Sequence, residues 1–183
     1  MNSSITNTRP ETTEYASYYQ RYTDLVPDGD IVTTLKRQMD QTLTLLRRID
    51  ENRGSYRYAP DKWSIKQLIG HVIDAERVFA YRALRFARSD SQAIPGFDQD
   101  QFMSGANFDD QLLEDLIDEY EHVRRATIAL LKPLSDEAWM RRGTASDNEV
   151  SVRALAHIMA GHELHHVQIL KTRYLNTADG ATA

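Results

Sequence analysis

Residues 151–170 have the sequence SVRALAHIMAGHELHHVQIL, in which apolar side chains recur every three or four positions. This spacing places the apolar side chains on one face of an α-helix. Two histidines share that face, because His162 and His166 are four residues apart and lie within about 40° of each other around the helix. The stretch therefore predicts an amphipathic helix that carries two imidazole rings on its buried apolar face.

Three further stretches show the same spacing of apolar residues. They cover residues 30–49, 65–89 and 109–132, and the second begins with Ser64 and Gln67 in the pattern of a capping box. Signals for β-strands are almost absent. Four amphipathic helices of about twenty residues can most simply bury their apolar faces by packing against one another. We therefore expect an all-α fold, a four-helix bundle of the up-and-down type.

The connection between the second and third predicted helices is unusually long. It runs over twenty residues, 89–108, and includes apolar residues such as Phe97 and Phe102 that favour packing over exposure. Loops of this length inside a domain are usually functional or disordered. We interpret the segment as an ordered crossover that covers one end of the bundle, with Asp98 available to a site there; a plain connector is the alternative.

The composition limits the classes of function. The chain has 183 residues, a formal net charge of −5 and no cysteine. An acidic chain lacks the usual driving force for binding nucleic acid. Without cysteine, a metal can be held only by His, Asp or Glu, and disulfides and thiolate sites are excluded. The longest apolar runs have four residues, against about 20 for a membrane span.

The ends of the chain differ from its centre. The first fourteen residues are polar and lack the apolar region of a secretory signal, which predicts a frayed tail and a cytoplasmic protein. We expect a polar extension at 1–27, one bundle domain at 28–175 and a flexible tail at 176–183. A homodimer is expected, as is common for bundles.

Buried histidines need partners. An unsatisfied buried polar group costs about 1–3 kcal/mol, and a divalent cation would satisfy His162 and His166 together. The alternative is that each ring bonds a carbonyl or hydroxyl of a neighbouring helix. A third ligand is expected from His71, at the border of the stripe of the second helix. His165 is expected to be a pocket group, whereas the two remaining histidines, His122 and His157, are expected at the surface.

The segment His162–His166 also has the pattern HExxH of zinc peptidases, with Glu163 in the place of the general base. Such enzymes take a third ligand from further along the chain. Only 17 residues follow His166, and Asp179 is the one candidate among them. A peptidase is therefore a minor alternative.

Three stretches, taken with this helix pattern, resemble the DinB/YfiT-like family of metalloenzymes. They read KWSIKQLIGHVIDAER at 62–77, PGFDQD at 95–100 and GHELHH at 161–166. The resemblance covers roughly residues 30 to 175. It implies a four-helix bundle with a metal held by one histidine of the second helix and two of the last, here His71, His162 and His166. Many members have Glu where this chain has Gln67.

The resemblance also implies a choice of reactions on a small-molecule substrate. Characterised members transfer a low-molecular-weight thiol or use one for isomerisation, while others are described as metal-dependent hydrolases. Three neutral imidazoles would leave a divalent ion, zinc or nickel, its full charge and an open position. Thiol transfer is favoured, hydrolysis by water activated on the metal is the alternative, and a non-catalytic binding module is a third reading.

Further residues could take part in this chemistry. Glu163 and Asp98 are the carboxylates that could act as a base, and His165 could assist them. Arg82 and Arg85 follow His71 by about three and four helical turns, so they could meet an anionic cosubstrate at the rim; the alternative is that both lie on a solvated helix face. Trp63 is expected to anchor the start of the second helix.

Overall fold

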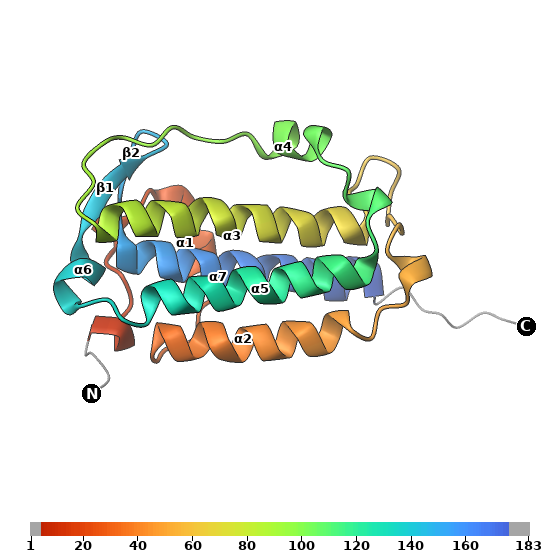
Figure 1. The fold of residues 1–183 in the computed structure, drawn as a ribbon, viewed down its shortest axis with the longest axis horizontal. Helices are drawn as coiled ribbons and strands as arrows, with labels where there is room; N and C mark the ends of the chain where they lie inside the picture. Colours follow the sequence, from red (N-terminus) through yellow and green to blue (C-terminus); the bar gives the residue numbers. More distant parts are fainter. Residues whose placement is uncertain (1–4, 176–183) are drawn as a thin grey trace, which may run out of the picture.

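The structure is a computed structural model that describes residues 5–175 and is built almost entirely from helices (Figure 1). Its four long helices are α2 (Ile31–Leu46), α3 (Ile65–Ala87), α5 (Leu113–Leu131) and α7 (Val152–Ile169). A π-helical segment, Leu170–Leu175, continues α7. Each long helix falls within one of the stretches predicted from apolar spacing. The predicted all-α four-helix bundle is confirmed.

Shorter elements complete the described chain. The short α-helices are α1 (Gln20–Thr23), α4 (Gln99–Gly105) and α6 (Asp136–Met140), and the strands are β1 (Arg142–Ala145) and β2 (Asn148–Ser151). Single 3₁₀ turns lie at Ile5–Asn7, Thr12–Glu14, Ser17–Tyr19, Glu51–Arg53 and Phe108–Asp110.

The hairpin of β1 and β2 was not predicted from the sequence. The two strands pair antiparallel, with Gly143 opposite Val150, and positive φ angles of 51° at Ser146 and 61° at Asp147 form the turn. Each strand has only four residues, too few for a clear alternation of apolar and polar positions. A Ser-Asp turn is also a weaker hairpin signal than Asn-Gly or Asp-Gly.

Side-chain caps define where the long helices begin. The carboxylate of Asp30 accepts from the Thr33 amide at the start of α2. Ser64 and Gln67 bond reciprocally at the start of α3, so the predicted capping box is confirmed. Each cap satisfies amide groups that have no partner within the first helical turn.

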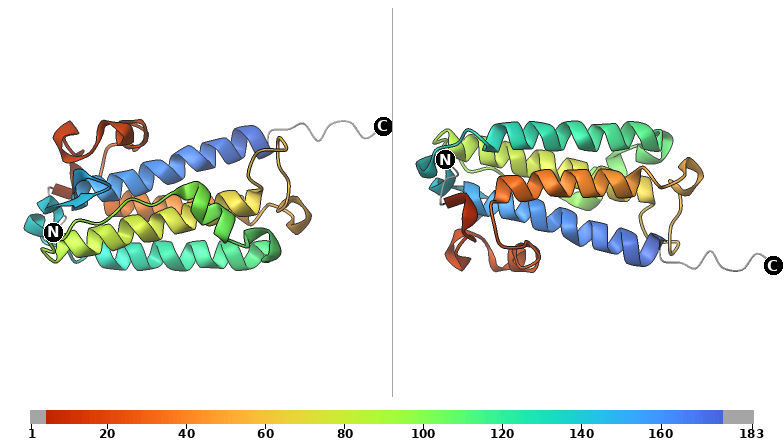
Figure 2. Two further views of the ribbon diagram at one scale, coloured as in Figure 1. Left: turned by 90° about the horizontal axis from the view of Figure 1, so that it is seen from above. Right: turned by 90° about the horizontal axis from the view of Figure 1, so that it is seen from below.

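The order of the helices in space explains the long crossover. α3 packs against α5 and α7, and α2 packs against the same two helices from the opposite side. α3 and α5 run in the same direction, so the chain must return along the length of the bundle between them (Figures 1 and 2). The predicted crossover is thus confirmed, but it follows the outer side of α3 and does not cover one end of the bundle. Because the crossover makes α3 and α5 parallel, the four helices do not alternate in direction as the expected up-and-down type requires.

The N-terminal segment packs on the bundle in the part that the structure describes. α1 lies against α7, and the side chains of Tyr22 and Val26 are buried. Glu14 is 0% exposed and forms an ion pair with Arg153 of α7. The expected frayed tail is therefore wrong for residues 5–14, because this buried pair holds the segment in place. The tail predicted at 176–183 lies outside the described residues.

No helix within residues 5–175 is both long enough and apolar enough to cross a membrane.

Candidate metal centre

Three histidines from two neighbouring helices meet inside the bundle. His71 projects from α3, and His162 and His166 project from successive turns of α7. One ring nitrogen from each lies within 4.8 Å of the other two, and Nε2 of His71 is 3.1 Å from Nε2 of His162. The ring centroids are 4.5–5.0 Å apart. The structure thus brings together the three histidines that were predicted as ligands.

Burial keeps these three imidazoles neutral at pH 7. Their exposed fractions are 5% for His71, 6% for His162 and 9% for His166. Burial lowers the pKa of His71 to about 4, and burial together with the neighbouring His71 and His165 lowers the pKa of His166 to about 3. The pKa of His162 falls well below its usual range for the same reason, with further repulsion from His166 and His71. A neutral ring has a lone pair to offer.

The donor set fits a divalent transition metal. Two nitrogens bonded to one ion at about 2.0–2.1 Å lie at most about 4.2 Å apart, so the 3.1 Å between the rings of His71 and His162 suits a shared ion. The other pairs of nitrogens lie within 4.8 Å, which is at most about 0.6 Å beyond that limit. Nδ1 of His166 is buried and has no hydrogen-bond partner among residues 5–175. Imidazole ligands suit ions such as zinc and nickel.

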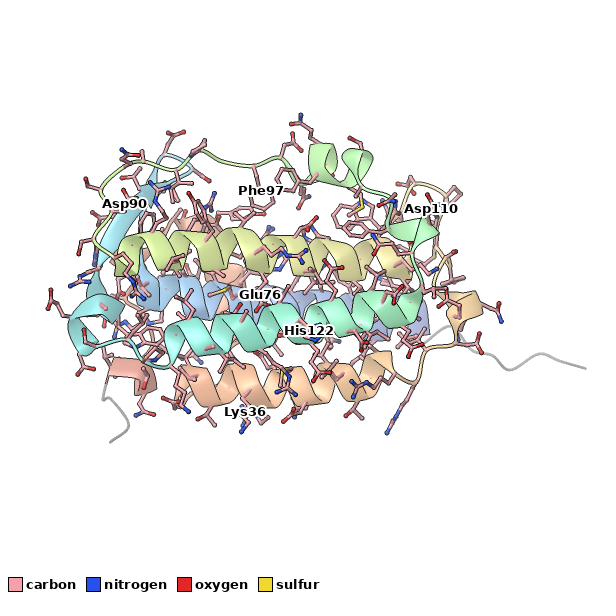
Figure 3. All side chains as sticks on the ribbon, viewed as in Figure 1. Lys36, Glu76, Asp90, Phe97, Asp110 and His122 are labelled. Atoms are coloured by element: carbon pink, nitrogen blue, oxygen red, sulfur yellow. The ribbon has the colours of Figure 1, made fainter. Side chains whose placement is uncertain are left out.

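An aromatic cavity of about 220 Å³ adjoins the three histidines. His71 and His162 form part of its wall. The remaining lining residues come from the N-terminal segment, α3, the crossover and the hairpin; they are Tyr18, Tyr19, Tyr22, Phe79, Phe97, Gln99 and Ser146. Phe97 lies between the crossover and α3 (Figure 3). The histidines are thus accessible to a small organic molecule.

The tyrosines of this wall were not predicted from the sequence. Tyr15, Tyr18, Tyr19 and Tyr22 follow the spacing i, i+3, i+4 and i+7. That spacing is the signal of a one-sided aromatic face, and it lies in the segment expected to be a polar extension. The ring of Tyr22 packs edge-on against His162, at 5.3 Å between centroids.

Glu163 does not face the three histidines. Its Oε1 accepts hydrogen bonds from Thr42 of α2 at 2.5 Å and from Tyr120 of α5 at 2.6 Å. Its Oε2 lies 2.7 Å from Nη2 of Arg124, outside a favourable hydrogen-bond angle, so that contact is electrostatic. Because the neighbouring helices occupy both oxygens, the expected base role of Glu163, and with it the peptidase alternative, has no support in the geometry.

The other two residues expected to assist catalysis lie differently. Asp98 is exposed, and its carboxylate caps α4 by accepting from the amides of Asp100 and Gln101. It does not line the cavity, because the cap directs its oxygens to the helix. His165 is half-buried and packs against His166 and Tyr22, at centroid distances of 5.1 Å and 5.4 Å. His165 therefore lies beside the three histidines, but it is not among the residues that line the cavity.

The two arginines of α3 have different environments. Arg85 forms an ion pair with Asp90 and donates to the hydroxyl of Tyr81, so the expected role at the rim is wrong for Arg85. Arg82 is 2% exposed, which excludes both a rim position and a solvated face. Its Nη2 donates to the hydroxyl of Ser146 at 2.9 Å and to the carbonyl of Pro95 at 3.3 Å.

One of the two histidines expected at the surface is buried. His157 is 2% exposed, and its Nδ1 lies 3.0 Å from the carbonyl of Arg153 one turn earlier in α7. The expectation is wrong because the N-terminal segment covers this side of α7. His122 is exposed on α5, as predicted.

Comparisons with known proteins agree with the fold. A curated protein of Oceanobacillus iheyensis, named "Putative metal-dependent hydrolase OB0413", is 26% identical over 163 residues, which cover 84% of this chain and 92% of that protein. The solved structure of YfiT from Bacillus subtilis, described as a probable metal-dependent hydrolase with an unusual four-helix bundle topology, superposes with a TM-score of 0.66 at 11% identity, covering 92% of this chain and 95% of that one.

A mycothiol-dependent maleylpyruvate isomerase has a similar fold, with a TM-score of 0.60 at 14% identity. The match covers 75% of this chain and 58% of the isomerase, which is therefore considerably longer. The model of one sequence family, described as the DinB superfamily, matches residues 34–170. Those residues contain all four long helices apart from the first three positions of α2, as well as the three clustered histidines. The chain therefore belongs to the DinB superfamily.

Proposed function

We propose that this protein is a metal-dependent enzyme that acts on a small organic molecule, by joining a low-molecular-weight thiol to an electrophilic substrate. The observation that carries the proposal is the opening of the histidine cluster to the aromatic cavity through His71 and His162. A divalent ion held by three neutral imidazoles would supply a Lewis acid that lowers the pKa of a thiol or of water. His71, His162 and His166 would hold that ion.

The surroundings of the cluster favour a thiol over water as the nucleophile. A thiol has a pKa of about 8.5 and is a strong nucleophile once it loses its proton, so it does not need a carboxylate base beside it. Both carboxylates expected to act as a base are engaged elsewhere, Glu163 by Arg124 and Asp98 by the start of α4. The isomerase with a similar fold is described as mycothiol-dependent, which agrees with this preference.

In the proposed reaction, the sulfur of the thiol forms a bond to an electrophilic carbon of the substrate. The leaving group departs with the electron pair of the bond that breaks. The thiol proton passes to solvent or to the half-buried ring of His165 beside the cluster. The aromatic rings of Tyr22 and Phe79 would hold the substrate and exclude water.

Hydrolysis is the second candidate. The Oceanobacillus iheyensis relative and YfiT are both described as metal-dependent hydrolases, though neither description states a substrate. Water would then take the place of the thiol at the same cluster.

Activity measurements on the zinc-loaded and nickel-loaded protein separate these candidates. The first assay pairs small thiols with chlorodinitrobenzene, and the second uses nitrophenyl esters and anilides without thiol. We expect thiol-dependent turnover that is lost in His162→Ala and retained in His122→Ala, the exposed control. Hydrolysis that needs no thiol would establish the second candidate instead. A fully metal-loaded protein without turnover in either assay would contradict both and support a binding module.

A further inference from the structure

Arg82 is a buried cation without a carboxylate partner among residues 5–175. Three arginines are buried within residues 5–175: Arg82, Arg124 and Arg153. Arg124 faces two glutamates and Arg153 faces Glu14, whereas Arg82 forms no ion pair in the described part of the chain. Its Nη2 has only neutral acceptors, and its Nε is buried without any acceptor there. Buried charges are normally paired, so a partner from outside the described residues is expected.

The guanidinium group of Arg82 lies against the wall of the aromatic cavity. Its central carbon is 5.9 Å from the ring centroids of both Phe79 and Phe97, and Nη2 is 2.9 Å from the hydroxyl of Ser146. All three of these neighbours line the cavity. Arg82 itself is buried behind these three neighbours, so an anion held at this part of the wall would lie next to the guanidinium group.

The spacing along α3 places Arg82 and His71 on the same side of the cavity. The two residues are eleven positions apart, which corresponds to about 16 Å along the helix and to faces within about 20° of each other. A long side chain on a helix leans toward the N-terminal end, so the arginine side chain extends toward His71. A ligand with an anionic group at one end can thus present its other end to the histidine cluster.

We propose that Arg82 anchors a carboxylate of the substrate at the end of the cavity remote from the three histidines. The substrate class is therefore a small organic acid with an apolar middle and an electrophilic centre distant from its carboxylate. This inference rests on the proposed function for the reaction at the other end, whereas the anion site itself can be tested without turnover. A guanidinium binds a carboxylate through paired hydrogen bonds, which a neutral amide cannot replace.

The test compares two probes of nearly equal shape, phenylacetate and phenylacetamide, by calorimetric titration of the full-length zinc-loaded protein. We expect phenylacetate to bind at least about tenfold more tightly than the amide. Arg82→Gln should remove that preference, and Arg85→Gln, the control on the same helix, should retain it. Equal binding of both probes to the wild-type protein, or an unchanged preference in Arg82→Gln, would overturn the proposal.

A second pair of variants covers the case in which Arg82→Gln does not fold. Ser146→Asp places a carboxylate beside the guanidinium, and aspartate tolerates the positive φ of 51° at this position. We expect Ser146→Asp to raise the melting temperature and to lower phenylacetate affinity at least about tenfold, while the neutral control Ser146→Asn does neither. Affinity that is unchanged in Ser146→Asp would contradict the proposal.

The same titrations on chelated, metal-free protein separate this inference from the proposed function. A preference for phenylacetate that survives metal removal and depends on Arg82 supports the anchor even if no activity is found. If the preference instead disappears with the metal and is unchanged in Arg82→Gln, the carboxylate binds the ion. That result would overturn the proposed role of Arg82 but would leave the metal centre in place.

Discussion

Arg124 of α5 and Glu163 of α7 meet at the centre of the bundle, with Nη2 and Oε2 2.7 Å apart and both side chains almost fully buried. Arg124 also binds both carboxylate oxygens of Glu76 on α3, at 2.7–3.0 Å. Figure 3 shows Glu76 between the helices. Consecutive residues of α7 therefore serve two centres: His162 faces the cavity, and Glu163 joins three helices through one buried arginine.

We expect Glu163→Gln to destabilise the protein without loss of metal. The substitution removes a charge that faces Arg124 in a dry environment, and breaking a buried ion pair from one side costs about 3–5 kcal/mol. Because the amide still accepts from Tyr120 and Thr42, we expect a loss of about 2 kcal/mol in the free energy of unfolding. Urea denaturation measures the loss, and elemental analysis measures metal content. The control is Glu137→Gln, which removes an exposed ion pair with Arg141 and should change stability by less than about 0.5 kcal/mol.

A catalytic role for Glu163 would give the opposite pattern. The variant would then keep its stability and lose turnover at full metal occupancy.

The histidine cluster predicts a strong effect of metal on thermal stability. An ion present at a hundred times its dissociation constant adds about 2.7 kcal/mol, which raises the melting temperature of a chain of this size by about 5–10 °C. Alanine at His71, His162 or His166 should abolish both this increase and stoichiometric binding. Elemental analysis and calorimetry of zinc-loaded and chelated samples measure the two effects. His122→Ala should behave like the wild type, and one tight ion per chain retained in all three cluster variants would refute the ligand assignment.

The helices and the histidine cluster could be predicted because both depend on periodicity within single helices. Apolar spacing identified each long helix, and the four-residue interval placed His162 and His166 on one turn. His71 was found at the border of the stripe of α3. That His71 meets the two histidines of α7 depends on which helices are neighbours in the bundle. The sequence does not state this order directly.

The buried charges could not be predicted from the sequence. Glu76, Arg124 and Glu163 are residue types that are almost always exposed, and none shows a local pattern that distinguishes it from a surface residue. Their burial depends on the simultaneous approach of three helices. The path of the crossover could not be predicted for the same reason. It follows from the parallel arrangement of α3 and α5, which no local signal in the sequence reveals.

Stability should fall with acid because of His157. Its pKa is lowered by burial to about 4 in the folded protein, against 6.5 for an ordinary histidine. Below pH 6.5 the unfolded chain therefore binds a proton that the folded chain excludes, so the stabilisation is complete above pH 6.5 and is lost as the pH falls toward 4. The full shift corresponds to roughly 3 kcal/mol.

Urea denaturation of metal-free protein at pH values from 7 to 4 measures this dependence. His157→Gln keeps a donor for the Arg153 carbonyl but cannot titrate, so we expect it to reduce the slope over that range. The buried cluster histidines titrate in the same direction and leave a residual slope in the variant. Identical slopes in the wild type and His157→Gln would show that His157 does not contribute.

Gly161, the residue before His162, controls how closely the N-terminal segment approaches α7. A Cβ atom at Gly161 would lie 2.0 Å from the backbone oxygen of Tyr22, a distance at which α1 must move. Alanine normally stabilises a helix interior relative to glycine by about 1 kcal/mol. Here we expect Gly161→Ala to destabilise the protein by about 1–2 kcal/mol, because overpacking a close contact costs about 1–3 kcal/mol and a contact with backbone lies at the upper end of that range, which outweighs the gain. The displaced segment carries the three tyrosines that line the cavity, so phenylacetate affinity should fall while zinc stoichiometry remains unchanged.

The matched control is Gly105→Ala at the end of α4, where an added Cβ meets nothing within 4 Å. Limited trypsin digestion at Arg21 reports the displacement directly: cleavage should be faster in Gly161→Ala than in the wild type or the control, and equal rates in all three would mean that the close contact does not hold α1 against α7.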